Sequence, residues 1–139
     1  MTVTLDDEAR RRLVAFEEAT GAGAIDCIEV DERLVIVVER GEMAEAIGPD
    51  GRTIQRFEER IGRPVRLVEH AEDPETFVAN ALTPAAIYNV TISENDDTVA
   101  YVEVASEDRG VAIGTEGRTI EAARRLAARH VDVDDVQLT

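Results

Sequence analysis

Residues 46–54 read AIGPDGRTI, and residues 112–120 read AIGTEGRTI. Seven of the nine positions are identical at a spacing of 66 residues, and one of the two differences exchanges Asp50 for Glu116. The repeat uses four of the nine glycines of the chain, as two Gly-x-x-Gly motifs. Self-similarity at one fixed spacing indicates a duplicated structural unit.

The sequence before each motif predicts the same elements in both copies. Runs rich in β-branched residues, 33–39 and 98–104, have the length and composition of strands. Short helical stretches at residues 42–47 and 107–113 then lead into the glycine motifs. The duplication therefore extends beyond the motif itself.

The segment after each motif predicts a longer amphipathic helix. Ile54, Phe57 and Ile61 are spaced i, i+3 and i+7, which places them on one face of a helix. Gly62 and Pro64 are typical of a helix end, so we expect the helix to stop there. The second copy repeats the apolar face at Ile120, Ala123, Leu126 and Ala127.

Each half also begins with a helix and a strand. Asp6 suits the N-cap of a helix that runs to about Thr20, and Gly21 suits the position after its end. In the second half, Asp73 and Pro74 suit the start of a helix. The other expected strands are residues 24–30, 65–68, 87–93 and 133–138.

The expected order in each half is helix, strand, strand, helix, helix, strand. This order predicts an α+β fold of two tandem domains, at residues 1–71 and 72–139. Because almost no linker separates the halves, we expect the two domains to pack rigidly as one unit.

The composition is typical of a folded, soluble protein. Hydrophobic residues make up 44% of the 139 residues, which is enough to build a core. No apolar run approaches the ~20 residues of a membrane span, and the N-terminus does not have the features of a signal peptide. We therefore expect a cytoplasmic protein with no membrane partner. The single cysteine, Cys27, excludes an intramolecular disulfide and a thiolate metal cluster.

The net charge of −15 argues at first against nucleic acid as a partner, because neutralised phosphates drive that binding. All fifteen basic residues are Arg. An acidic chain without Lys resembles proteins of salt-loving organisms, in which salt screens the repulsion between surface charges.

The distribution of charge is more informative than its total. Residues 48–63 and 110–130 together hold eight Arg and five acidic residues, a net charge of +3. The other 102 residues carry a net charge of −18. The few positive charges therefore gather around the two repeated motifs.

The order of elements, with Gly-x-x-Gly between two adjacent helices, resembles the type II KH domain. Two such domains in direct succession resemble the archaeal NusA-like transcription termination factors. The residues that carry the resemblance are 46–54, 112–120 and their flanks, and it covers essentially all of the chain.

The resemblance implies that each loop clamps the backbone of single-stranded RNA. Glycine lets a phosphate approach the backbone, and the helix that follows directs N–H groups and its dipole toward an anion. Arg52 and Arg118 would bind phosphates, and Ile47 and Ile113 would help to line a groove for bases. The expected RNA-binding residues are Gly48, Pro49, Asp50, Gly51, Arg52, Ile54, Gly114, Thr115, Glu116, Gly117, Arg118 and Ile120.

An alternative is that each loop is a tight turn that binds nothing. Many members of the KH family carry a basic residue inside the loop, whereas this chain has Asp50 and Glu116. A carboxylate beside a phosphate opposes binding, and Pro49 removes one backbone donor. The isoleucines around the loops could equally be ordinary core residues.

Other candidate sites are weak. His70 and His130 have no second ligand or nucleophile at a recognisable spacing, and Cys27 is most simply a small buried residue. The acidic run at residues 132–135 is best read as solvated surface. We therefore expect no metal, no cofactor, no small-molecule substrate and no enzymatic activity.

The sequence favours an RNA-binding factor of transcription termination or antitermination, with single-stranded RNA and RNA polymerase as partners. Two alternatives stay open because a fold does not fix a function. One is a KH-fold scaffold for protein interactions, and the other is an RNA-binding protein of ribosome assembly or translation.

Overall fold

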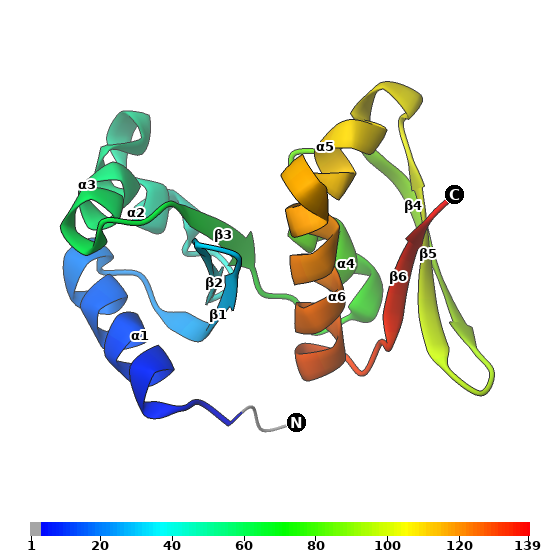
Figure 1. Ribbon diagram of the computed structural model, residues 1–139, viewed down its shortest axis with the longest axis horizontal. Coiled ribbons are helices and arrows are strands. Elements are labelled where there is room, and N and C mark those ends of the chain that lie inside the picture. The colour runs from blue at the N-terminus through cyan, green and yellow to red at the C-terminus, as the bar shows by residue number, and fades with distance from the viewer. Residues whose placement is uncertain (1–3) are drawn as a thin grey trace. The chain divides into compact units, whose positions relative to one another are not determined.

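The computed structural model describes residues 4–139, which divide into two compact units (Figure 1). The first unit ends at His70, and the second unit is Ala71–Thr139. In each unit a helix and two strands are followed by two helices and a last strand. This order confirms the predicted α+β fold.

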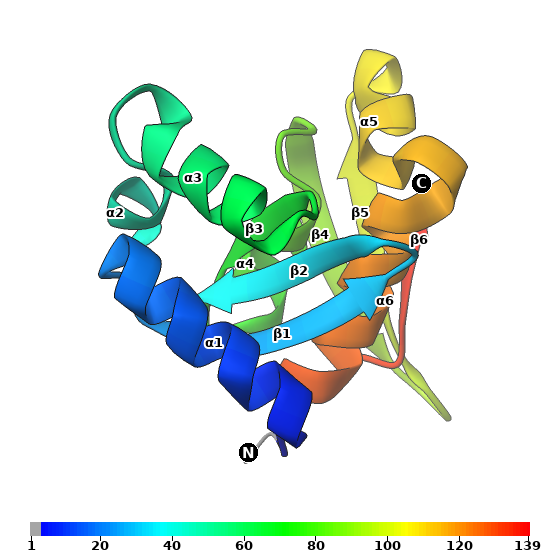
Figure 2. The same cartoon turned by 60° about the vertical axis from the view of Figure 1, so that its left-hand side comes forward.

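The first unit is a mixed sheet with its helices beside it. Strand β1 is antiparallel to β2, and β2 is parallel to β3, so β2 is the central strand. Figure 2 shows β1 and β2 side by side, with α1 along β1. The elements are α1 (Asp7–Thr20), β1 (Ala24–Val30), β2 (Arg33–Val38), α2 (Met43–Ile47), the 3-10 turn η1 (Pro49–Gly51), α3 (Arg52–Ile61) and β3 (Val65–Glu69).

The second unit repeats this topology. Strand β4 is antiparallel to β5, and β5 is parallel to β6. Its elements are α4 (Pro74–Ala81), β4 (Ile87–Glu94), β5 (Thr98–Val104), the 3-10 turn η2 (Ser106–Asp108), α5 (Arg109–Ile113), the 3-10 turn η3 (Thr115–Gly117), α6 (Arg118–His130) and β6 (Asp135–Leu138).

The first helix of each unit begins at an aspartate cap, as the sequence predicts. Asp6 Oδ1 accepts a hydrogen bond from the Ala9 N–H at 2.7 Å. Asp73 Oδ2 accepts one from the Thr76 N–H at 2.8 Å. Each carboxylate thereby satisfies a backbone donor that has no partner within the helix.

The core of the first unit lies between its helices and one face of the sheet. Phe57, on the predicted apolar face of α3, meets Phe16 of α1 edge to face, with ring centroids 5.4 Å apart. Both rings are at most 1% exposed. Ile54 and Ile61 are partly buried and pack against the same core, which confirms the predicted stripe.

The second unit builds its core from smaller side chains. Helix α6 packs against α4 and β6. The aromatic contribution comes from Phe77 of α4, which is fully buried and whose ring lies 5.5 Å from the His130 ring. The predicted inward residues of α6 are all buried, namely Ile120, Ala123, Leu126 and Ala127.

Most element ends agree with the expected ones to within one residue, and two segments differ more. Strand β6 begins at Asp135 instead of residue 133, because the Val133 N–H still donates to the Ala127 carbonyl at the end of α6. The expected helix at residues 107–113 is divided into η2 and α5. The expected rigid packing of the two domains stays a prediction.

Candidate nucleic-acid interface

The two Gly-x-x-Gly loops have nearly the same backbone conformation. Gly48 has φ 76° and ψ 175°, and Gly114 has φ 80° and ψ 167°, a region that is essentially restricted to glycine. The N–H of Gly51 donates to the Gly48 carbonyl at 3.1 Å, and that of Gly117 donates to the Gly114 carbonyl at 3.0 Å. Each motif therefore closes as a tight turn between two helices.

The first glycine of each motif is required by packing inside the loop. A Cβ atom at Gly48 would lie 2.0 Å from Thr53 Oγ1, and one at Gly114 would lie 2.3 Å from Thr119 Oγ1. No side chain fits in that space. The first glycine therefore allows the loop to fold back on the following helix.

The second glycine has a different environment. Gly51 and Gly117 both have φ 74°, and no atom lies within 4 Å of a Cβ built on either residue. The space beside them is open to an approaching group. This is the place where a phosphate can come close to the backbone.

Helices α3 and α6 begin directly at these open glycines. Gly51 and Gly117 are their N-caps, and within residues 4–139 neither helix has a side-chain cap. The first helices of the two units, in contrast, begin at side-chain caps, Asp6 and Asp73. The first N–H of each helix, on Arg52 and Arg118, donates to the Pro49 and Thr115 carbonyl respectively. The positive dipole end of α3 and α6 is still directed toward the loops, where it favours an anion.

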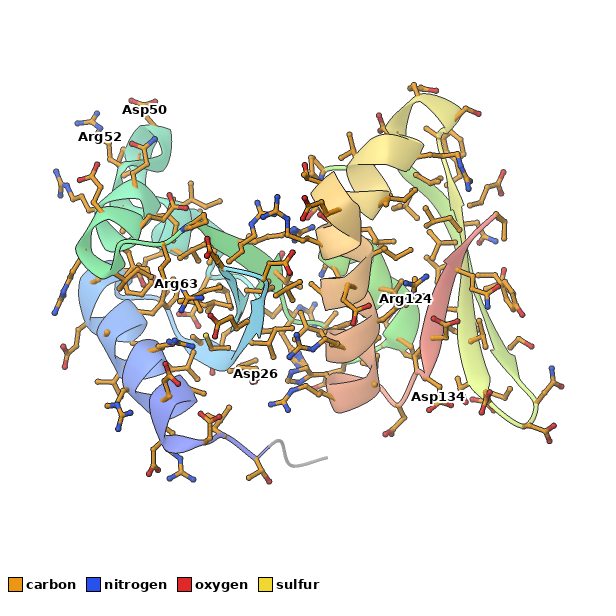
Figure 3. All side chains as sticks on the ribbon, in the orientation of Figure 1. Asp26, Asp50, Arg52, Arg63, Arg124 and Asp134 are labelled. Atoms are coloured by element: carbon orange, nitrogen blue, oxygen red, sulfur yellow. The ribbon has the colours of Figure 1, made fainter. Side chains whose placement is uncertain are left out.

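The loop carboxylates lie at the outer ends of the turns. Asp50 and Glu116 adopt left-handed backbone conformations, with φ 53° and 56°. Asp50 Oδ2 lies 3.4 Å from Arg52 Nη2, and both side chains are largely exposed (Figure 3). An exposed ion pair of this kind contributes little. In the second loop, Arg118 Nε donates to the Thr115 carbonyl at 3.1 Å.

A groove of about 440 Å³ adjoins the second loop. It is shallow and largely open to solvent. Apolar side chains from α5, α6 and β6 line it together with two arginines and the open glycine of the loop. These residues are Ile113, Ile120, Leu138, Arg109, Arg124 and Gly117.

Arg124, one of the two arginines of the groove, is bonded to residues of strand β6. Arg124 Nε lies 3.0 Å from Asp135 Oδ1 and donates to the Val136 carbonyl at 3.1 Å. Figure 3 shows the side chain between α6 and β6. Burial acts to raise the pKa of Asp135, but hydrogen bonds from Gln137 and the Val136 N–H and the charge of Arg124 together lower it. Asp135 therefore remains ionised and anchors Arg124 beside the groove.

The structure places the predicted isoleucines in two classes. Ile47 and Ile113 are 38% and 39% exposed, which is unlike core residues. Ile54 packs against the core of the first unit, whereas Ile120 is 7% exposed and also lines the groove of the second. Ile113, Gly117 and Ile120 are thus brought together, as the resemblance implies.

Sequence reasoning missed the role of Arg109, Gln137 and Leu138 as groove residues. They come from the start of α5 and from β6, so no local motif connects them to the loop. The clustering of arginines at residues 110–130 was the one available indication, and it included Arg124.

The other candidate sites gain no support. Among the residues that the structure describes, no group of three or more His, Cys, Asp or Glu side chains could hold a metal ion. Cys27 is buried, and burial raises the pKa of its thiol to about 11. Within the described part of the chain, no helix has the length and apolar character needed to cross a membrane.

Comparison with known proteins gives a consistent result. Residues 74–138, within the second unit, match the family described as "NusA-like second KH domain". A protein of Halobacterium salinarum named "Probable transcription termination protein NusA" is 58% identical over all 139 residues of both chains. A protein of the same name from Methanococcus vannielii is 32% identical over 99% of this chain and 80% of its own length.

More distant relatives are similar over less of their length or at lower identity. The "Transcription termination/antitermination protein NusA" of Mycobacterium bovis is 33% identical over 63% of this chain, which corresponds to 25% of that protein. The crystal structure of APE1850 has a TM-score of 0.84 and 29% identity, and the match covers 97% of this chain and all of that one. The paired-unit fold therefore exists in an experimentally solved protein.

Proposed function

Since the chain belongs to the family of NusA-like transcription termination proteins, we propose that it acts in transcription termination or antitermination by binding single-stranded RNA. The proposal assigns two KH domains, at the expected limits 1–71 and 72–139. It includes no catalytic step.

The observation that supports RNA binding best is the groove beside the second loop. Gly117 offers open backbone at the start of α6, where an anion is favoured. Ile113 and Ile120 offer apolar surface next to it, and Arg109 and Arg124 supply positive charge. A strand of RNA has the matching chemistry, because it alternates phosphates with flat bases that can leave water.

The mechanism is capture of a transcript by its backbone and its unstacked bases. A phosphate lies against the open glycine and the first turn of the following helix, while neighbouring bases enter the groove. Double-stranded nucleic acid keeps its bases stacked and paired, so it cannot use the apolar part of this site. RNA polymerase is the proposed protein partner, which would bring the protein to emerging transcript in the cytoplasm.

Binding to short fluorescent RNA oligonucleotides tests the proposal. We expect the wild-type chain to bind single-stranded RNA more tightly than a duplex of the same sequence, and the affinity to fall with added KCl. A double variant, Gly51→Asp with Gly117→Asp, should lose this binding because it places a carboxylate at both open glycines. Equal and negligible binding by both proteins would contradict RNA binding and favour the interaction scaffold.

A second experiment separates the transcription role from a role at the ribosome. Affinity capture with the tagged wild-type chain should retain RNA polymerase subunits after nuclease treatment. Recovery of ribosomal subunits without polymerase would support the ribosomal alternative instead. The double glycine variant is the matched control, because a direct contact with polymerase does not require the RNA site.

A further inference from the structure

The two units carry opposite charges at one matched position. Glu58 of α3 and Arg124 of α6 are 66 residues apart, the spacing of the repeat. Both are partly buried. The position is one of those that line the groove in the second unit, so its charge directly affects any strand bound there.

Both side chains contact the same point of the last strand. Val65 pairs with Leu34, and Val136 pairs with Ala100, which is 66 residues after Leu34, so the two valines are equivalent. Glu58 Oε2 accepts a hydrogen bond from the Val65 N–H at 2.7 Å. Arg124 Nε donates one to the Val136 carbonyl at 3.1 Å. The helix is joined to the strand in both units, but with reversed polarity.

Two further differences between the units also leave the first unit with fewer groups that could bind a phosphate. Met43 occupies in the first unit the position that Arg109 has in the second. Pro49 replaces Thr115 in the loop, which removes a backbone donor and a hydroxyl group. At these three positions the first unit has Glu58, Met43 and Pro49. The second unit has Arg124, Arg109 and Thr115.

From these differences we propose that the second unit carries most of the RNA affinity, and that it does so because Arg124 binds a phosphate of the RNA. Within residues 4–139, both contacts of Arg124 use Nε and not the two terminal nitrogens. Those nitrogens can bind a phosphate of a strand whose bases lie against Ile113 and Ile120. At the same place in the first unit, the carboxylate of Glu58 repels the phosphate. The inference rests on the proposed function, which supplies RNA as the ligand.

The open glycines give a matched pair of variants. Gly51 and Gly117 have the same φ, and a Cβ at either meets no atom within 4 Å, so an aspartate imposes the same local strain on both. With single-stranded RNA as the probe, we expect Gly117→Asp to weaken binding more than about tenfold, the loss of a charge-assisted contact. Gly51→Asp should weaken it less than about threefold, as a remote surface charge does.

A second pair of variants removes the charges of Arg124 and Glu58. Arg124→Gln should weaken binding about tenfold and reduce the slope of log affinity against log salt by about 0.7, the value for one phosphate contact on a single strand. Glu58→Gln should leave the affinity unchanged or increase it. If Arg124 only anchors β6, Arg124→Gln will lower the melting temperature and leave the salt slope unchanged, which overturns its assigned role. Arg124→Lys, which keeps the charge, should restore part of the slope.

The outcomes separate this inference from the proposed function. If the wild-type chain binds no single-stranded RNA, the proposed function fails. If the wild-type chain binds but Gly51→Asp costs as much as Gly117→Asp or more, RNA binding stands and the dominance of the second unit is overturned.

Discussion

The first glycine of each loop allows packing to be tested separately from binding. A Cβ at Gly48 or Gly114 would collide with the threonine five residues later, and both residues have positive φ. We expect Gly48→Ala and Gly114→Ala each to lower the free energy of unfolding by at least about 2 kcal/mol, the cost of a strained backbone and a steric overlap. Urea denaturation followed by circular dichroism measures this change.

Gly110 provides the control for this prediction. It lies in α5, has no positive φ, and a Cβ on it would meet no atom within 4 Å. Gly110→Ala should therefore stabilise the protein by up to about 1 kcal/mol through helix propensity. A comparable loss of stability in this variant would contradict the assigned role of the collision.

The thiol of Cys27 predicts a dependence of stability on pH. Burial raises its pKa from 9.0 to about 11, so the folded state favours the neutral thiol. Below pH 9 both states are protonated and this contribution to stability is fully present. As the pH rises from 9 to 11, only the unfolded chain loses its proton readily, and the free energy of unfolding falls. Urea titrations across this range should show the decline, and Cys27→Ala should remove it.

The residues of the site were only partly predictable from the sequence. The repeat locates both loops and their glycines, because a duplicated motif is visible without structure. It does not distinguish the packed first glycine from the open second one. That distinction depends on where the side chains of Thr53 and Thr119 lie in space.

At the scale of the elements, the two aspartate caps give a direct test of helix initiation. Asp6→Ala and Asp73→Ala each remove the acceptor of a backbone N–H and should cost about 1 kcal/mol. Thermal unfolding measures the effect. The corresponding Asn variants keep an acceptor oxygen and should retain most of the stability. Equal losses in the Ala and Asn variants would show that charge, and not the cap, is responsible.

The caps were predictable because they are local, whereas strand ends depend on distant partners. Asp6 and Gly21 lie at the two ends of α1, as expected. The start of β6 differed from the expected one because the chain after α6 is still bonded to the Ala127 carbonyl. The reversed contacts of Glu58 and Arg124 could not be predicted for the same reason. Their partners lie on strands whose position is set by the sheet.

At the scale of the whole molecule, the net charge of −15 predicts that salt stabilises the fold. The screening length falls from ~10 Å at 0.1 M to ~3 Å at 1 M salt, which reduces the repulsion among surface carboxylates. The melting temperature should therefore rise with KCl over this range. A triple variant with amides at Glu94, Asp96 and Asp97, exposed residues around one hairpin turn, should show a smaller rise. A rise as large as that of the wild type would mean that repulsion at this turn is not relieved by salt.

Salt acts on RNA binding in the opposite sense. Added ions weaken phosphate contacts while they stabilise the folded chain. Binding at high salt therefore has to rely more on apolar contacts in the groove and less on long-range attraction. An acidic protein can meet RNA under these conditions because its arginines are concentrated at the loops.

The reversed contact at Glu58 and Arg124 also bears on how a duplicated chain avoids misfolding. Two halves with seven of nine identical loop residues could exchange strands during synthesis, which is a known hazard of repeats. In such a mispaired chain, the carboxylate of Glu58 would take the place of Arg124 beside the carboxylate of Asp135, which lies 3.0 Å from Arg124 Nε in the native fold. Arg124 would lose this ion pair, because the residue before Val65 is Pro64 and offers no carboxylate. Two like charges would meet in one place and an ion pair would be lost in the other, so the charge at this one helix position favours the pairing of each helix with its own strand.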